Sequence, residues 1–239
     1  MIDTTGNRNI KAGFSTRTDL NPAAAQPMDR AKGFTLWVKA QLLSEEHFTD
    51  GDPLKDRAGY NVIVLSKDLL GIEIAFWENE IWAQEFVSGD SSRRFIKAEG
   101  TAADPTSGQA QYAIWVRGDE YRFFLDGNAG FRGSLRDYSN EGFPYNEANF
   151  IFFGDNTTSA LGASATANLS LSFHAPGDLN GGGDATLADA LIALQALAGL
   201  SPPELDPAWA ISGGDVDGDF QAGLAEAIYA LQWSAEVRK

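Results

Sequence analysis

Two acidic segments near the C-terminus carry the residues best suited to binding a cation. They are residues 178–189 (DLNGGGDATLAD) and 215–226 (DVDGDFQAGLAE), each twelve residues long, and they begin 37 residues apart. Each segment places oxygen-bearing side chains at alternate positions and ends with a carboxylate at the twelfth, a spacing that lets a short loop surround a hard cation. Calcium is the expected occupant, because it accepts about six to eight oxygens in a flexible shell. The chain has no cysteine to hold zinc.

The residues expected to hold two calcium ions share equivalent positions in the two segments. Positions one, three, five and twelve would supply side-chain oxygens, and position seven a backbone carbonyl. The expected ligands are Asp178, Asn180, Asp184 and Asp189 in the first segment, and Asp215, Asp217, Asp219, Gln221 and Glu226 in the second.

Two residues depart from the ideal loop pattern. Gly182 stands at position five of the first segment and offers no carboxylate, so the first site is expected to bind calcium more weakly than the second. Phe220 stands at position six of the second segment, where glycine normally supplies a left-handed turn. A phenylalanine there is expected to cost on the order of 1 kcal/mol or more.

An apolar segment follows each acidic loop and is predicted to form a helix. The two segments are 187–200 and 224–232, and each has an apolar stripe at spacings of three and four residues. The stripes are expected to bury each other in an antiparallel pair, since so small a module has little other core. Ile192 and its neighbours make the first helix apolar nearly all round, so the excess is expected to contact another surface. The stripes consist of Leu187, Leu191 and Leu194, and of Leu224, Ile228 and Leu231.

Together, the two loop-helix repeats resemble a dockerin type I module over about residues 176–235. The runs GDLNGGG and GDVDGDF stand where that family has a Gly-Asp-x-Asn-x-Asp-Gly run. The resemblance implies a module that folds around calcium and docks into a cohesin-like partner protein.

Charge restricts the partners and the compartment. The net charge is -15, and residues 176–239 hold ten acidic residues against two basic ones. Such a chain is expected to repel nucleic acid and anionic membranes. No apolar run is long enough to span a bilayer, and the chain opens without a signal segment. Weak calcium loops work at roughly 0.1 to 1 mM calcium, which indicates an extracellular or cell-surface location.

Residues 1–175 are predicted to be a separate, mainly β domain, followed by the calcium-binding module at 176–239. Short alternating runs at 33–42, 60–66, 69–77, 80–87, 111–118, 120–127, 149–155 and 168–174 predict strands that must pair as two sheets. Residues 9–15 are expected to form a further strand near 168–174. The runs AIWVRGDEYRFFLDGN and NFIFFGDN are similar to the concanavalin A-like jelly-roll β-sandwich of laminin G and legume-lectin modules.

Three tryptophans offer a candidate carbohydrate surface on this sandwich. Alternation puts Trp37, Trp77 and Trp115, with Arg117, on the more polar sides of their strands. An aromatic ring beside hydrogen-bonding residues suits a sugar. The alternative is that these tryptophans pack in the core, as large aromatics usually do.

Catalysis has little support in the sequence. His47 and His174 are the only histidines, and a Cys-His pair is impossible. The closest acidic pair, Glu78 and Glu80, is expected in a turn and does not complete a glycosidase motif. The chain is therefore expected not to be an enzyme but to attach to glycan or protein surfaces. A structural subunit that self-associates in a filament or surface layer is the alternative, and a polysaccharide-active enzyme is less favoured.

Overall fold

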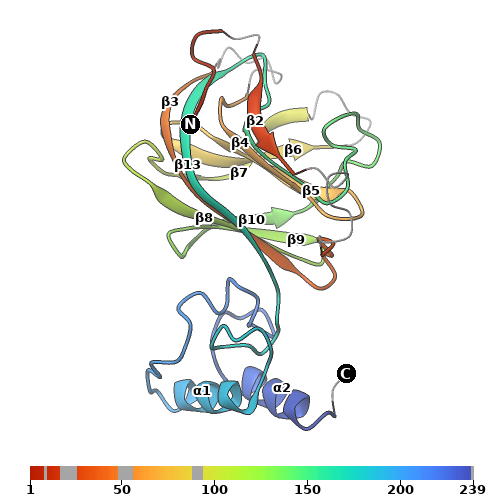
Figure 1. The fold of residues 1–239 in the computed structure, drawn as a ribbon, viewed down its shortest axis with the longest axis vertical. Coiled ribbons are helices and arrows are strands. Elements are labelled where there is room, and N and C mark those ends of the chain that lie inside the picture. Colours follow the sequence, from red (N-terminus) through yellow and green to blue (C-terminus); the bar gives the residue numbers. More distant parts are fainter. Residues whose placement is uncertain (8–9, 17–25, 48–55, 88–93, 238–239) are drawn as a thin grey trace. The chain divides into compact units, whose positions relative to one another are not determined.

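The computed structural model describes residues 1–7, 10–16, 26–47, 56–87 and 94–237. The chain forms two compact units (Figure 1). One consists of Met1–Ala31 with Leu36–Ser170, and the other of Lys32–Thr35 with Leu171–Lys239. The first unit is a β-sandwich, and the second contains both helices.

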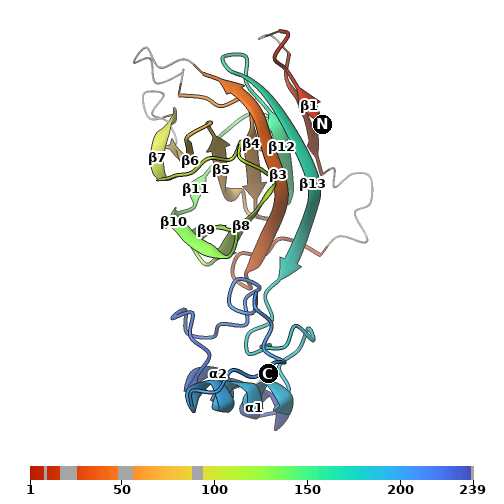
Figure 2. The same cartoon turned by 90° about the vertical axis from the view of Figure 1, so that its left-hand side faces the viewer.

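Two sheets of antiparallel strands build the sandwich, as Figure 2 shows, which confirms the predicted fold class. The six-stranded sheet has the order β1 (Ile2–Asp3), β13 (Leu161–Phe173), β3 (Phe34–Glu46), β8 (Ala110–Arg117), β9 (Glu120–Leu125) and β10 (Asn128–Ser134). The seven-stranded sheet has the order β2 (Ala12–Ser15), β12 (Phe150–Asp155), β4 (Asn61–Leu65), β5 (Leu70–Phe76), β6 (Glu80–Phe86) and β7 (Arg94–Ala102), and β11 (Arg136–Asp137) pairs with β5.

The central strands of the seven-stranded sheet are buried on both faces. All five residues of β4 are buried, so its sequence NVIVL is a continuous apolar run rather than an alternating one. On one face, Ile63 and Leu65 pack with Tyr138, Tyr145 and Phe150, two of which come from the long connection between β11 and β12. This connection therefore covers the part of the sheet that includes the pairing of Ile63 with Glu73.

The N-terminal segment pairs differently from the prediction. Residues 9–15 were expected beside 168–174, but β2 pairs with β12, where Phe14 lies opposite Phe153. The shorter β1 pairs with β13 instead, with Ile2 opposite Ser164. The prediction for 9–15 is wrong because a four-residue edge strand carries too little apolar pattern to choose between sheets. β7 and β10 had not been predicted, since glycine and charged residues interrupt their alternation.

The second unit contains α1 (Leu187–Leu197), which lies within the predicted segment 187–200, and α2 (Leu224–Ser234), which begins as predicted and extends two residues beyond 232. A loop of irregular structure precedes each helix. Among the helices of the described residues, none combines the length and the apolar character needed to cross a membrane.

Candidate functional site

Both acidic loops have the same unusual backbone. At position four, Gly181 and Gly218 have φ angles of 74° and 86°, and at position six Gly183 and Phe220 have 98° and 61°. Phe220 therefore adopts the left-handed conformation that its place in the loop demands, although it lacks the freedom of glycine. The two loops share their form as well as their spacing.

The first aspartate of each loop holds the loop closed. Asp178 accepts hydrogen bonds from the backbone N–H groups of Gly182 and Gly183, at 3.0 and 2.7 Å. Asp215 accepts them from Gly218 and Phe220, at 2.7 and 3.0 Å. Both carboxylates are buried, so the loop folds around its first residue.

The carboxylate at position twelve joins each loop to its helix. Asp189 and Glu226 occupy the third position of α1 and α2 and are fully buried. Asp189 accepts from the backbone of Leu179 and Asn180 with one oxygen, and from the backbone and hydroxyl of Thr186 with the other. Among the described residues, Glu226 accepts one hydrogen bond at each oxygen, from the backbone N–H of Val216 at 3.1 Å and from that of Gly223 at 3.0 Å.

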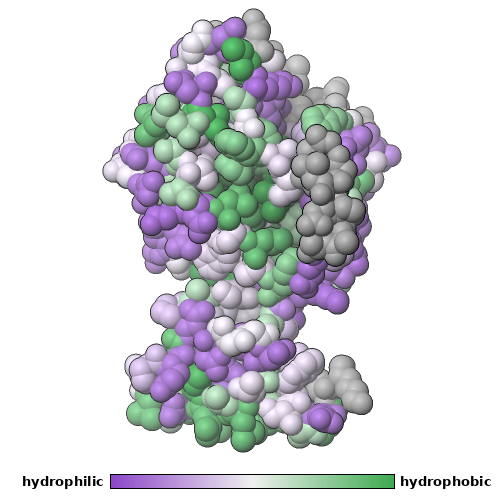
Figure 3. All heavy atoms as spheres, in the orientation of Figure 1, coloured by the Kyte–Doolittle hydropathy of each residue, from purple (hydrophilic) through white to green (hydrophobic). Residues whose placement is uncertain are grey.

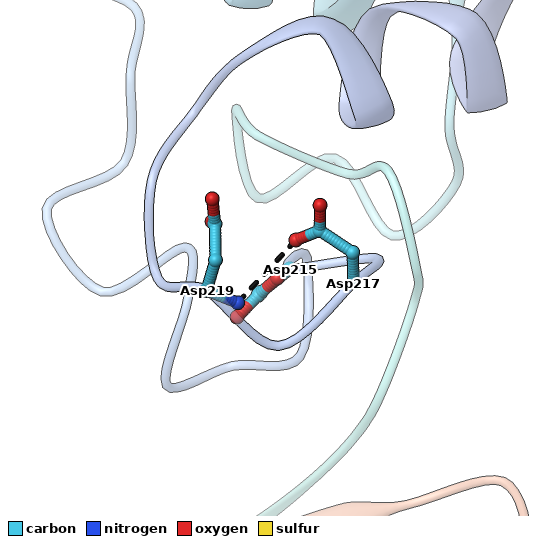
Figure 4. Close-up of side chains that lie close together, drawn as sticks. All are labelled: Asp215, Asp217 and Asp219. Atoms are coloured by element: carbon cyan, nitrogen blue, oxygen red, sulfur yellow. Dashed lines mark hydrogen bonds between the residues drawn. The ribbon is translucent and has the colours of Figure 1, made fainter.

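Three carboxylates of the second loop converge. Asp215, Asp217 and Asp219 each present an oxygen, and these oxygens lie within 4.8 Å of one another. Figure 4 shows the three side chains rising from one tight loop, with the backbone N–H of Asp219 donating to Asp217. Two oxygens bound to one calcium ion at about 2.3–2.6 Å are at most about 5 Å apart, so the separation of these three oxygens is compatible with a single calcium ion.

The first loop offers fewer oxygens to a cation. Gly182 supplies no side chain at position five, and its N–H donates to Asn180 as well as to Asp178. The side chain of Asp184 is exposed, as is that of Gln221 in the second loop, in keeping with ligands that would act through backbone carbonyls. In each loop the expected ligand residues therefore lie close together, and the second loop offers more carboxylates than the first.

The helices pack through faces other than those predicted. Ala190 and Ala193 of α1, with Ala227 and Ala230 of α2, are buried between the helices and their loops. Ile192 is also buried, against Leu179 and Trp209. The predicted stripes instead lie on the surface: Leu187, Leu191, Leu194, Leu224, Ile228 and Leu231 are between 42% and 59% exposed. The expectation that they bury each other is wrong, and we call these six residues the leucine surface.

Apolar side chains gather over both helices in the space-filling view (Figure 3). Leu197 and Leu200 after the α1 stripe, and Trp233 in α2, are exposed as well. An exposed apolar area of this density is typical of a protein-protein contact.

The structure does not bring the three tryptophans together. Trp37 on β3 is half-buried and Trp115 on β8 is buried, both in the six-stranded sheet. Trp77 follows β5 in the other sheet, where it is buried against Trp82 and stacks on His47 with 3.8 Å between ring centroids. Arg117 is half-buried at the hairpin that joins β8 and β9, opposite Glu120.

Glu78 and Glu80 lie at the turn between β5 and β6, as predicted. Glu80 forms an ion pair with Lys97 at 2.6 Å, and Glu78 accepts a hydrogen bond from the backbone of Glu45. The other histidine, His174, contacts the hydroxyl of Thr35 at 3.0 Å within the second unit.

The sandwich also contains a polar pocket that the sequence did not predict. It measures about 370 Å³ and lies between Phe143–Tyr145 and residues 156–159, beside Lys11 and Arg57. Behind it, Glu73 is fully buried at the centre of β5. The one available signal was Glu73 itself, a charged residue between two isoleucines.

A network of hydrogen bonds joins Glu73 to the pocket wall. Gln84 and Asn156 donate to the same carboxylate oxygen of Glu73 at 2.9 and 3.2 Å, and the hydroxyl of Tyr145 donates to the other. Arg57 forms an ion pair with Glu73 at 3.7 Å and donates to the Asn156 side chain at 3.1 Å. Burial raises the pKa of Glu73 against the opposing effect of Arg57, and burial also raises the pKa of Tyr145 well above its usual range.

Comparison with known proteins finds similar solved structures but no family. No protein-family model matches the sequence, and no curated protein is similar to it. Sheep galectin-11 with glycerol is similar in structure, with a TM-score of 0.36 and 10% identity over 68% of this chain and 98% of the galectin. The carbohydrate-binding module CBM66 of Bacillus subtilis has a TM-score of 0.34 and 10% identity over 59% of this chain and 74% of the module.

Alginate lyases are also among the similar structures. The family 7 alginate lyase A1-II′ in complex with its product has a TM-score of 0.39 and 13% identity, over 68% of this chain and 71% of the lyase. The lyase AlyA1 of Zobellia galactanivorans has a TM-score of 0.37 and 14% identity, over 63% of this chain and 65% of the enzyme. The expectation that the chain is not an enzyme is corrected by this finding, because sandwiches of this kind occur in enzymes and binding modules alike. At these values the likeness assigns neither a family nor an activity.

Proposed function

We propose that residues 171–239 form a calcium-dependent docking module of the dockerin kind. The observation that carries the proposal is the convergence of Asp215, Asp217 and Asp219, whose oxygens lie within 4.8 Å in a loop closed by buried Glu226. Because the first loop shares the backbone form of the second, a second and weaker ion is proposed for residues 178–189.

Calcium would hold the loops and helices together. Without a cation, three carboxylates at this separation repel one another, and Glu226 links that repulsion directly to the start of α2. Calcium binding would therefore be coupled to folding of the module. Loops of modest affinity would be occupied at the calcium concentration found outside cells, which supports an extracellular or cell-surface location.

The leucine surface is proposed as the docking face. Its members occur in three pairs separated by 37 residues, so each helix presents an equivalent apolar stripe. The proposed partner is a cohesin-like protein domain with an apolar face. Self-association into larger assemblies is the competing outcome, and it would appear as an increase in mass with protein concentration.

For the sandwich, we propose saccharide binding at the polar pocket rather than at the three tryptophans. The rim carries the exposed ring of Phe143, and residues 156–159 supply an amide and three hydroxyl groups. An apolar ring beside hydrogen-bonding groups matches the apolar faces and hydroxyls of a sugar.

Calorimetric titration of the full chain with calcium tests the docking-module proposal. Wild type should bind two ions with different affinities, and Asp217→Asn should weaken only the tighter site. Glu204→Gln removes a charge from an exposed residue outside both loops and is the matched control. Absence of calcium binding by wild type at millimolar concentration would refute the proposal.

A further inference from the structure

The polar pocket has an unusual charge for this protein. The whole chain has 33 acidic and 18 basic residues, yet the described residues that line the pocket include Lys11 and Arg57 and no carboxylate. Two cationic side chains in the wall of a pocket favour an anionic ligand over a neutral one.

Two buried carboxylates, those of Asp155 and Glu73, hold residues of the pocket wall in place. Asp155 is buried and accepts hydrogen bonds from the hydroxyl of Thr4 at 2.6 Å and from Thr157 at 2.8 and 3.0 Å. Glu73 is buried beneath Arg57 and Asn156. These carboxylates fix the side chains that line the pocket, and neither lines it.

Arg57 is held in place before any ligand arrives. Its guanidinium donates to the Asn156 side chain at 3.1 Å and pairs with Glu73 at 3.7 Å, while its own backbone carbonyl accepts from the indole of Trp77 at 3.0 Å. A positioned guanidinium loses little freedom on binding an anion, and its planar fork suits a carboxylate or sulfate group. Burial strengthens that attraction, because water screens it less.

The remaining walls suit a sugar ring. Phe143 is 77% exposed, so its ring is open to a ligand, whereas Tyr145 is buried and fixed by Glu73. Thr158 and Ser159 carry hydroxyl groups at the more accessible part of the wall. The volume of about 370 Å³ falls within the range of about 300–1,000 Å³ that is typical of small-molecule sites.

We propose that this pocket binds an acidic saccharide, with the anionic group of one sugar unit between Lys11 and Arg57 and the sugar ring against Phe143. This inference rests on the proposed saccharide binding by the sandwich and adds the class of sugar and the residues that select it. Lys11 is exposed and draws the anion toward the pocket, and Arg57 binds it there.

Paired trisaccharides test the inference with the full chain in calcium. The probes are oligomers of galacturonic acid and of glucuronic acid, each compared with its neutral galactose or glucose counterpart. The acidic member of at least one pair should bind more tightly than its neutral counterpart, and added salt should reduce this difference in affinity. Lys11→Gln should weaken the acidic member by about fivefold, as expected for a partly exposed charge pair, and leave the neutral one unchanged.

Control variants separate the site from the fold. Lys39→Gln removes an exposed charge on β3 that does not line the pocket, and it should bind like wild type. Phe143→Ala should weaken binding of the acidic and the neutral trisaccharides alike. Arg57 is buried, so removing its side chain can unfold the sandwich. Arg57→Lys keeps the charge but loses the planar guanidinium, so it tests what the guanidinium contributes to binding of the acidic member.

The outcomes are distinguishable. Equal binding of acidic and neutral members overturns the charge selection and leaves saccharide binding intact. Tighter binding of the acidic member that neither Lys11→Gln nor Phe143→Ala weakens overturns the pocket as its site. If no member of any pair binds, both this inference and the proposed saccharide function of the sandwich fail.

Discussion

Asp189 and Glu226 occupy the same place in the two loop-helix repeats, but their carboxylates are used differently. Each closes its loop at position twelve and is buried at the third position of its helix. Asp189 accepts four hydrogen bonds from its own chain, whereas Glu226 accepts two. Glu226 thus retains more capacity to bind a cation, while Asp189 mainly fastens its loop to α1.

We therefore expect opposite consequences from two matched amide substitutions. Glu226→Gln should weaken calcium binding at the tighter site by roughly tenfold or more, because it removes a charged ligand. Asp189→Asn should chiefly lower stability, by about 1–3 kcal/mol, because an amide cannot accept all four hydrogen bonds. Calcium titration and urea unfolding of both variants would separate the effects. Equal losses of affinity in the two variants would contradict the assigned division of roles.

Chelation of calcium should unfold the second unit selectively. The helical circular dichroism of α1 and α2 should fall in excess chelator, because the carboxylates of Asp215, Asp217 and Asp219 then repel at close range. The β-strand signal of the sandwich should persist, and it provides the internal control. An identical helical signal in chelator and in millimolar calcium would show that the loops need no metal.

The face that each helix turns inward follows from the loop before it, whereas the apolar periodicity predicted the opposite face. Successive residues turn by about 100° around a helix, so Leu187, Leu191 and Leu194 lie roughly 140–160° away from Asp189. Because Asp189 must face its loop, those leucines must face outward, and the same geometry applies to α2 with Glu226. Small alanines on the inner side then let the helices approach closely. A pattern of large apolar residues identifies an apolar stripe, but it does not tell whether that stripe packs inside the module or lies on its surface.

In the sandwich, local pattern predicted the strands but not the pocket. The β8–β9 hairpin follows directly from alternation and a tight turn, and the structure pairs Val116 with Tyr121 as that pattern requires. The pocket depends instead on Lys11, Arg57, Tyr145 and Asn156, which are far apart in sequence and meet only through the topology of the sheets. The local signal is limited to Glu73, a charged residue between two isoleucines, and it does not indicate which distant residues join it.

Substitutions on the leucine surface should abolish docking without harming the fold. Leu191→Glu with Ile228→Glu changes residues that are 59% and 45% exposed, so the unfolding free energy should shift by about 1 kcal/mol or less. Calcium binding should be retained, while binding to a cohesin-like partner should be lost. By contrast, Ile192→Glu, which sequence periodicity placed on an outer contact, should unfold the module because Ile192 is buried beside Trp209. Analytical ultracentrifugation with and without partner measures the effect, and unchanged docking by the double variant would refute the assigned face.

The Trp115 side chain should contribute to stability rather than to sugar binding. It is 6% exposed and lies beneath the guanidinium of Arg122, 5.1 Å from the ring centroid. Trp115→Ala should cost about 3–5 kcal/mol, as is usual for a buried tryptophan. Saccharide binding, measured at a temperature where the variant stays folded, should match that of wild type. A variant of normal stability that loses saccharide binding would instead restore the tryptophan platform as the binding surface.

The buried carboxyl group of Glu73 should give the sandwich a measurable pH dependence. Burial raises its pKa above the ordinary value of 4.5 despite the nearby charge of Arg57, so the folded state holds this proton more tightly than the unfolded chain does. Its contribution to stability is therefore complete below pH 4.5 and is lost as the pH rises through the pKa of the folded state, at no more than about 1.4 kcal/mol per pH unit. Glu73→Gln removes this titration, so the unfolding free energy of wild type relative to the variant should fall as the pH increases across that range. Urea unfolding at fixed calcium and ionic strength measures the difference, with exposed Glu147→Gln as the matched baseline. A difference that stays constant or rises with pH would mean that Arg57 outweighs burial and keeps the pKa of Glu73 from rising above its ordinary value.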